Sequence, residues 1–168
     1  MAAGNTYTQI ASTTLGSAAS SVTFSSIAGT YTDLVLVTQV KGTSSSDQDL
    51  TAVFNSDTNT NYSRTILYGN GSVAGSVRAS NETSWKYATV PGTTTNQWEI
   101  ATLQLFNYYN ATTYKTGLIR RNQAGEATAA NVVLWRKAPE AITNIVLAPA
   151  AGSFATGSTF NLYGITAA

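Results

Sequence analysis

Apolar and polar residues alternate with a period of two along most of this chain, which predicts β-strands and leaves little room for helices. Three short runs are continuously apolar instead, which is typical of strands covered on both faces: 34–37, 132–135 and 145–147. The alternating runs occur at 22–24, 50–54, 62–68, 98–105, 114–120 and 160–163. The sequence therefore predicts a succession of short strands.

Turn-forming residues separate these runs. Gly, Asn, Ser, Asp and Pro gather at 42–46, 55–57, 69–71, 91–92, 122–125 and 151–153. Many short strands with frequent turns predict an all-β fold, a jelly-roll-like two-sheet antiparallel sandwich with little or no helix. At most one helical turn is expected, in the Ala-rich stretch 125–130. Since no linker interrupts the pattern, we expect residues 1–168 to form a single β-sandwich domain.

Composition excludes several functional classes. The 168 residues carry a net charge of +1 without a basic run, so binding of nucleic acid through phosphate neutralisation is not expected. No apolar stretch approaches the roughly 18 residues of a membrane helix, and Met1–Thr6 does not begin like a signal peptide. The chain has no His and no Cys, the usual general base, metal ligands and thiol nucleophile. We expect no cofactor and no enzymatic activity.

The carboxylates offer weak alternatives to this view. Asp47 and Asp49 lie on the same side of an extended segment and could hold calcium, although a solvated loop explains them better. The oxygen-rich segment 55–61 lacks the Gly and closing Glu of a helix–loop–helix calcium site, and a hairpin turn explains it equally well. A glycan hydrolase using Glu82 or Glu99 with an Asp is the least favoured interpretation.

Two doublets are candidate contacts for a partner or a glycan. Tyr108 and Tyr109 lie in a turn-like segment and are expected to form an exposed aromatic pair. Arg120 and Arg121 are adjacent in a strand, so they point to opposite faces, and one of them could meet an acidic neighbour. The remaining large aromatics are expected mainly in the core. Partner contacts are also expected in loops 42–48, 56–61, 91–96 and 121–128.

The low charge of the chain affects whether it remains monomeric in solution or joins an assembly. Charged residues make up 10% of the chain, against about 25% in an ordinary soluble domain. Sheets usually protect their edges with Lys or Pro, but this chain has nine basic residues and three prolines for its whole surface. One explanation is a stable protein whose environment tolerates low charge. The favoured explanation is a subunit of a larger assembly.

Several segments resemble small structural proteins of tailed bacteriophages, cyanophages included. The resemblance covers the opening segments 22–27 and 31–37, the Asn-centred segments 54–57 and 61–63, and the closing segment 157–165. It implies a jelly-roll-like sandwich that assembles, often as a homotrimer, on a particle surface. It implies no catalytic residues. The first and last strands, near Gln9–Ile10 and 162–165, are expected to be neighbours in one sheet.

Two functional hypotheses follow. The first is a virion structural protein, a capsid decoration or cement protein that binds the major capsid protein and stabilises the shell. The second is a tail-fibre or receptor-binding module that holds host surface polysaccharide with exposed aromatic residues. Under either hypothesis the protein resides on the virion surface after assembly in the host cytoplasm, with neither nucleic acid nor membrane as a partner.

Overall fold

The computed structural model describes residues 6–125 and 127–166, and within these ranges the chain forms strands and no helix. The strands are β1 (Tyr7–Thr14), β2 (Val22–Phe24), β3 (Asp33–Val40), β4 (Gln48–Phe54), β5 (Tyr62–Gly69), β6 (Ala74–Glu82), β7 (Trp85–Val90), β8 (Glu99–Phe106), β9 (Lys115–Gln123), β10 (Thr128–Trp135), β11 (Ile145–Pro149) and β12 (Thr159–Ile165). Accordingly, no described segment is a helix that could span a bilayer.

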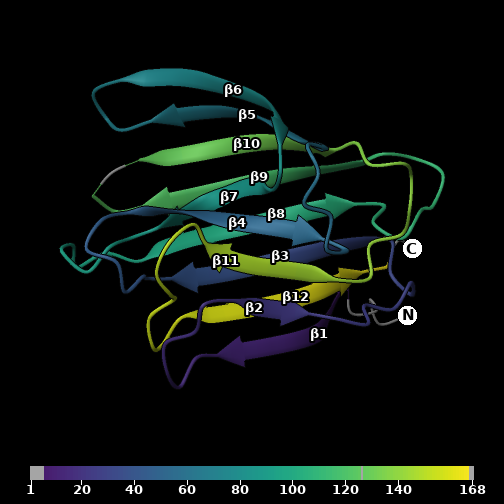
Figure 1. Ribbon diagram of the computed structural model, residues 1–168, viewed down its shortest axis with the longest axis horizontal. Coiled ribbons are helices and arrows are strands. Elements are labelled where there is room, and N and C mark those ends of the chain that lie inside the picture. The colour runs from purple at the N-terminus through teal and green to yellow at the C-terminus, as the bar shows by residue number, and fades with distance from the viewer. Residues whose placement is uncertain (1–5, 126, 167–168) are drawn as a thin grey trace.

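Two antiparallel sheets are layered as a β-sandwich (Figure 1). The larger has eight strands in the order β1-β12-β3-β8-β9-β10-β5-β6, and the smaller has four in the order β2-β11-β4-β7. From β2 onward the chain passes repeatedly between the sheets: β2, β4, β7 and β11 lie in the smaller, and the intervening strands lie in the larger. This alternation is that of a jelly roll, so the predicted fold class is confirmed.

The core lies between the two sheets and follows the predicted alternation. In β4, Leu50, Ala52 and Phe54 are fully buried, while Thr51 and Val53 are only partly covered. Phe54 packs edge-on against Trp85 with ring centroids 4.6 Å apart, and Trp135 lies 5.5 Å from Phe54. Such aromatic contacts stabilise a sandwich core beyond the burial of their area.

The termini of the described chain are fixed by pairing of the outermost strands. β1 pairs antiparallel with β12, from Tyr7 opposite Ile165 to Thr14 opposite Thr159. The expectation that the first and last strands are neighbours is therefore confirmed. The pairing also gives β12 two neighbours, since β3 binds its other edge.

The structure corrects two expectations. Continuous apolar character at 132–135 does not mean cover on both faces, because Val132 and Leu134 remain 54% and 38% exposed. The expectation of little or no helix agrees with the structure, since the segment 125–130 contains no helical turn among its described residues and β10 begins at Thr128. Finally, β6 and β7 were not anticipated as strands. β6 lies at a sheet edge and has only one large apolar residue, Val77, so its alternation is weak.

The hairpin β5–β6 extends beyond the smaller sheet (Figure 1). It forms the upper margin of the view, and β7, the last strand of the smaller sheet, lies below it. β6 is mostly exposed, whereas the central strands β3 and β8 are largely buried. The larger sheet thus overhangs the smaller one at this margin.

Candidate functional site

The outer face of the eight-stranded sheet is apolar over its centre, and no described segment of the chain covers it. Leu67, Ile100, Val132 and Leu134 are 61%, 45%, 54% and 38% exposed. Strand alternation places them all on the outer face, because the residues next to them in β8 and β10 face the core and are buried. We call the outward side of β5, β8, β9 and β10 the outer face.

Strand register makes these residues one continuous surface. Val132 lies opposite Leu118 of β9 on one side and Thr65 of β5 on the other. One row further, Arg120 lies opposite Ala130. Arg120 and Ala130 line a shallow hollow of about 680 Å³, together with Leu67, Ile100 and Thr102. The outer face is therefore a broad, gently hollowed surface of aliphatic and threonine side chains.

Charge on the outer face is sparse and positive. The outward positions of these four strands are Ser63, Thr65, Leu67, Gly69, Ile100, Thr102, Gln104, Phe106, Thr116, Leu118, Arg120, Asn122, Thr128, Ala130, Val132 and Leu134. They include one arginine and no carboxylate. A surface with so little charge resists association weakly, and its single cation favours an acidic neighbour.

Arg120 and Arg121 lie on opposite faces, as predicted. Arg120 is exposed on the outer face. Arg121 points inward, where its Nη1 donates to Thr89 Oγ1 at 3.1 Å and lies 3.4 Å from the buried Glu99 carboxylate. Of this doublet, only Arg120 is therefore placed to meet a partner on the outer face, while Arg78 of β6 and Arg136 line a neighbouring hollow with Val132 and Leu134.

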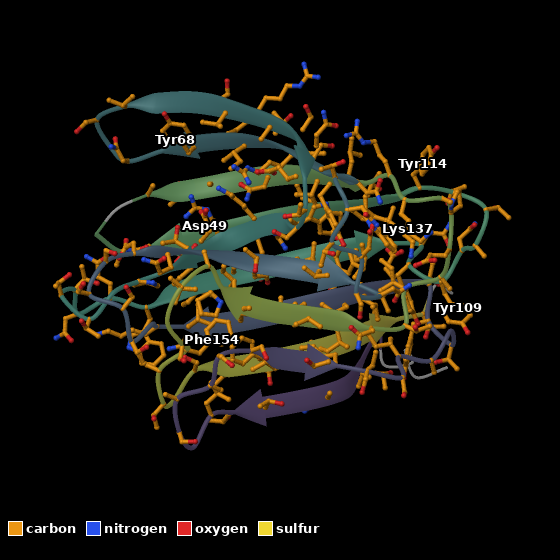
Figure 2. All side chains as sticks on the ribbon, viewed as in Figure 1. Asp49, Tyr68, Tyr109, Tyr114, Lys137 and Phe154 are labelled. Atoms are coloured by element: carbon orange, nitrogen blue, oxygen red, sulfur yellow. The ribbon has the colours of Figure 1, made fainter. Side chains whose placement is uncertain are left out.

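The prediction of an exposed tyrosine pair is wrong for Tyr108 and right for Tyr109. Tyr108 is fully buried and its hydroxyl donates to the carbonyl of Ala28, whereas Tyr109 is 44% exposed. The turn reverses direction at Asn107, which has a positive φ of 46°, and this turns Tyr108 into the core. Tyr114, 60% exposed, is a second accessible ring in the same β8–β9 loop (Figure 2).

The carboxylates of the sequence-based alternatives have structural partners. Asp47 accepts hydrogen bonds from the Gly92 amide at 2.8 Å and Gln123 Nε2 at 3.3 Å, which ties loop 42–48 to loop 91–96. Asp49 pairs with Lys86 at 2.7 Å. Among the described residues, no three His, Cys, Asp or Glu side chains gather as metal ligands would.

The two glutamates of the hydrolase alternative are held by different arginines. Arg64 Nη1 contacts both oxygens of Glu82, at 2.8 and 2.9 Å. Glu99 is fully buried beside Arg121. Each carboxylate thus neutralises an arginine on the neighbouring strand.

Asp57, in loop 56–61, is a structural centre that sequence reasoning did not single out. It is 97% buried, with an exposed fraction of 3%, and accepts a 2.7 Å hydrogen bond from Trp135 Nε1. Asn61 Nδ2 and Asn59 Nδ2 also donate to it, at 2.8 and 2.9 Å. Burial alone would raise the pKa of this carboxyl, but hydrogen bonds from Asn61, Trp135 and Asn59 outweigh it and lower the pKa below the usual value.

Lys115 is a second buried charged residue, and it stabilises the loop between β8 and β9. It is 1% exposed, and its ammonium donates to the carbonyls of Asn110 and Thr113, at 2.5 and 2.7 Å. Burial lowers the pKa of this lysine, although the charge of Glu140 opposes the shift.

Loop 121–128, one of the segments where partner contacts are expected, includes residue 126, which lies outside the described residues.

Comparison with known proteins yields a distant structural likeness. No protein-family model and no curated protein sequence matches this chain. Among solved structures, it is similar to that of the alginate lyase Aly36B, with a TM-score of 0.36 and 8% sequence identity. The alignment covers 92% of this chain and 77% of that one. At this level, the likeness carries no argument about function.

Proposed function

We propose that this protein is a virion structural protein of a tailed phage, which binds the head surface as a capsid decoration (cement) protein. Two supports are independent of each other. Segments 22–27, 31–37 and 157–165 resemble those of small phage structural proteins. The architecture offers a broad sheet face suited to covering a neighbour. The protein would act on the particle surface after assembly in the host cytoplasm.

The uncovered outer face is the observation that carries the proposal. Four large aliphatic side chains, Leu67, Ile100, Val132 and Leu134, face water from three strands of one sheet. Burying apolar surface contributes roughly 25 cal/mol per Å², so covering this face on a neighbour would stabilise the bound state. Monomeric proteins rarely leave a large contiguous apolar patch exposed unless it is used for binding.

Stabilisation of the shell would follow from mass action. A protein that binds assembled capsid subunits but not dissociated ones shifts the equilibrium toward the assembled shell. Arg120 would meet an acidic group of the neighbour, while the aliphatic residues would exclude water. The resemblance also implies that copies act together as a homotrimer, and repeated contacts would raise the overall affinity.

The proposed role requires no reaction, and the protein would not be an enzyme. The two glutamates considered for hydrolysis, Glu82 and Glu99, lie beside Arg64 and Arg121 and serve the packing of the larger sheet. The described carboxylate Asp57 is likewise buried against Trp135. The protein would then act through the area and shape of the surface that it covers, not through a catalytic group.

A tail-fibre or receptor-binding module is the second candidate. It is favoured by Tyr109 and Tyr114, two exposed rings in the loop between β8 and β9. Tyrosine rings of this kind can stack on the apolar faces of sugars. Figure 2 shows both rings at the same end of the molecule, away from the β5–β6 turn. On this view the 107–114 loop would face the host polysaccharide.

Heating particles separates the two candidates. Particles that lack the protein would be mixed with the purified wild type, with Val132→Lys or with Val73→Lys, and DNA release would be followed with a fluorescent dye. Val73 is a matched control, since it is 58% exposed but lies in the β5–β6 turn, off the outer face. We expect the wild type and Val73→Lys to raise the release temperature, and Val132→Lys to have little effect.

Two results would contradict the decoration role. Particles without the protein could release DNA at the same temperature as complete ones yet fail to adsorb to the host, which would favour the tail module. Alternatively, Val132→Lys could protect as well as Val73→Lys, which would remove the outer face from the contact.

A further inference from the structure

The outer face continues over the edge strand β6, where a small hollow gathers exposed arginines. The hollow has a volume of about 130 Å³ and lies over β5, β6 and the end of β10, at the margin of the larger sheet (Figure 1). Arg78 of β6 lies opposite the outward Thr65, so both point to the outer side, because directly opposed residues share a face. Arg136 follows the outward Leu134 by two residues and lines the same hollow. Two guanidinium groups thus lie beside the apolar centre of the outer face.

Neither of these exposed arginines has a carboxylate partner. Arg78 makes no ion pair or hydrogen bond with the described residues, and the Arg136 side chain makes a single one, from Nη2 to Asn81 Oδ1 at 3.5 Å. Glu82 is the only carboxylate of β5, β6 and β10, and Arg64 Nη1 binds both of its oxygens. The positive charge of the hollow therefore has no counter-ion within the described chain.

A bulge in β6 forms the end of this hollow. The register between β5 and β6 shifts between Tyr62 and Arg64, where β6 carries one extra residue. Asn81 has a positive φ of 59° there, a conformation that Asn adopts more readily than most residues. Bulges at sheet edges re-aim side chains. Here the bulge presents Asn81 Oδ1 to Arg136 and so holds that guanidinium group close to β6.

The chemistry of the hollow favours a carboxylate. A guanidinium group presents parallel N–H donors that match the two oxygens of a carboxylate, in charge-assisted hydrogen bonds. Val132 and Leu134 line the same hollow, so a neighbour that covered them would exclude water and strengthen the ion pair. A nucleic acid would need a track of cations along its phosphates, whereas two aliphatic side chains adjoin these arginines. The complementary group is therefore an acidic side chain of a protein.

We propose that this hollow binds an aspartate or glutamate side chain of the virion protein that covers the outer face. The carboxylate accepts hydrogen bonds from Arg78 and Arg136, and apolar residues next to it in the partner pack on Val132 and Leu134. This inference rests on the proposed function, since it names the acidic group by which a capsid subunit is recognised. The contact then extends past the aliphatic centre of the outer face to the edge strand β6.

Titration of the ¹⁵N-labelled protein with a capped tripeptide tests the carboxylate preference without any particle. The probe is acetyl-Leu-Glu-Leu-amide, and acetyl-Leu-Gln-Leu-amide is its uncharged control. We expect saturable NMR shifts at the Nε–H groups of Arg78 and Arg136 with a Kd of about 10 mM or tighter, and about tenfold weaker binding of the control peptide. Absence of saturable shifts at these two groups, equal binding of both peptides, or tighter binding of a short oligothymidylate would overturn the inference.

Binding to particles that lack the protein tests the same contact in its proposed setting. Arg78→Gln and Arg136→Gln should each bind about tenfold more weakly than the wild type, as expected for the loss of one charge-assisted hydrogen bond. Added salt should weaken the wild type more than either variant, because salt screens the ion pair. Lys86→Gln is the matched control, since it removes one charge from β7 in the smaller sheet, and it should bind like the wild type.

The outcomes separate this inference from the decoration role. A wild type that binds particles no more tightly than both arginine variants would overturn the inference and leave decoration standing. A wild type that does not bind particles but prefers the glutamate peptide would overturn the decoration role and support the carboxylate specificity of the hollow.

Discussion

Asp57 shows how one buried carboxylate joins segments that are far apart in the chain. Trp135, 78 residues away, donates to Asp57 Oδ2 at 2.7 Å. Tyr62 donates its hydroxyl to the Asp57 carbonyl at 2.9 Å and accepts from the Phe54 amide. The loop after β4 is thereby fixed to the end of β10, between the two sheets. These hydrogen bonds form one buried polar network at the end of the core.

Replacing Asp57 by Asn should destabilise the fold. An amide in place of the carboxylate loses one acceptor and presents a donor to Asn61, so buried donors are left unpaired. We expect a loss of about 1–3 kcal/mol in the free energy of unfolding, measured with urea at neutral pH. Asp49→Asn is the matched control, since its ion pair with Lys86 is about 45% exposed and contributes at most about 1 kcal/mol. Equal losses in both variants would contradict the buried role of Asp57.

The Asp57 carboxylate also makes the stability of the fold depend on pH in the acid range. The pKa of Asp57 is lowered below 3.8 in the folded protein, so its contribution is present above that value and is lost as pH falls through the folded pKa. The difference in stability between the wild type and Asp57→Asn should therefore shrink as the pH is lowered below 3.8. A difference that stays constant from neutral to acidic pH would show that the charge of Asp57 does not matter.

At the scale of elements, the β5–β6 hairpin is expected to open more readily than the rest of the fold. β6 is an edge strand whose side chains are mostly exposed, and the smaller sheet does not extend beneath it. Regions with few buried apolar contacts open locally at low free energy. Amide hydrogen exchange should therefore be fastest in β6 and slowest in β3 and β8. Equal protection of β6 and β8 would contradict this order.

Strand alternation predicts the central elements well because their inner and outer residues differ in polarity. It correctly places Leu50, Ala52 and Phe54 on the core side of β4. It does not reveal β6, because small and polar residues pair along a sheet edge without a buried face. Nor does it show that 132–135 has one uncovered side, since a continuous apolar run looks the same whether a neighbour covers it or not.

The candidate sites depend on contacts between residues that are far apart in the sequence. Arg120 could be placed on a sheet face from strand period alone, and its exposure agrees with that prediction. Tyr108 could not, because a turn at Asn107 decides which of two adjacent rings points inward. Arg64, Arg121 and Asn131 line one small hollow on the inner side of the larger sheet, yet they come from three strands, and only the sheet order brings them together.

For the whole molecule, the resemblance to phage structural proteins predicts self-association. We expect the purified chain to sediment as an oligomer with about three times the mass of one 17.6 kDa chain. Val132→Lys and Val73→Lys should both leave this equilibrium unchanged, because the outer face is proposed to meet the capsid and not another copy. A wild type that stays monomeric at every concentration would contradict self-association.

We propose that this chain works by laying its outer face on a neighbouring virion protein. Electron cryo-microscopy of intact particles tests it most directly, because it locates each copy and the face that each one turns to the shell. We expect copies on the head surface, with Leu67, Ile100, Val132 and Leu134 buried against capsid subunits. Copies found only at the tail, with this face open to solvent and Tyr109 and Tyr114 directed outward, would contradict it.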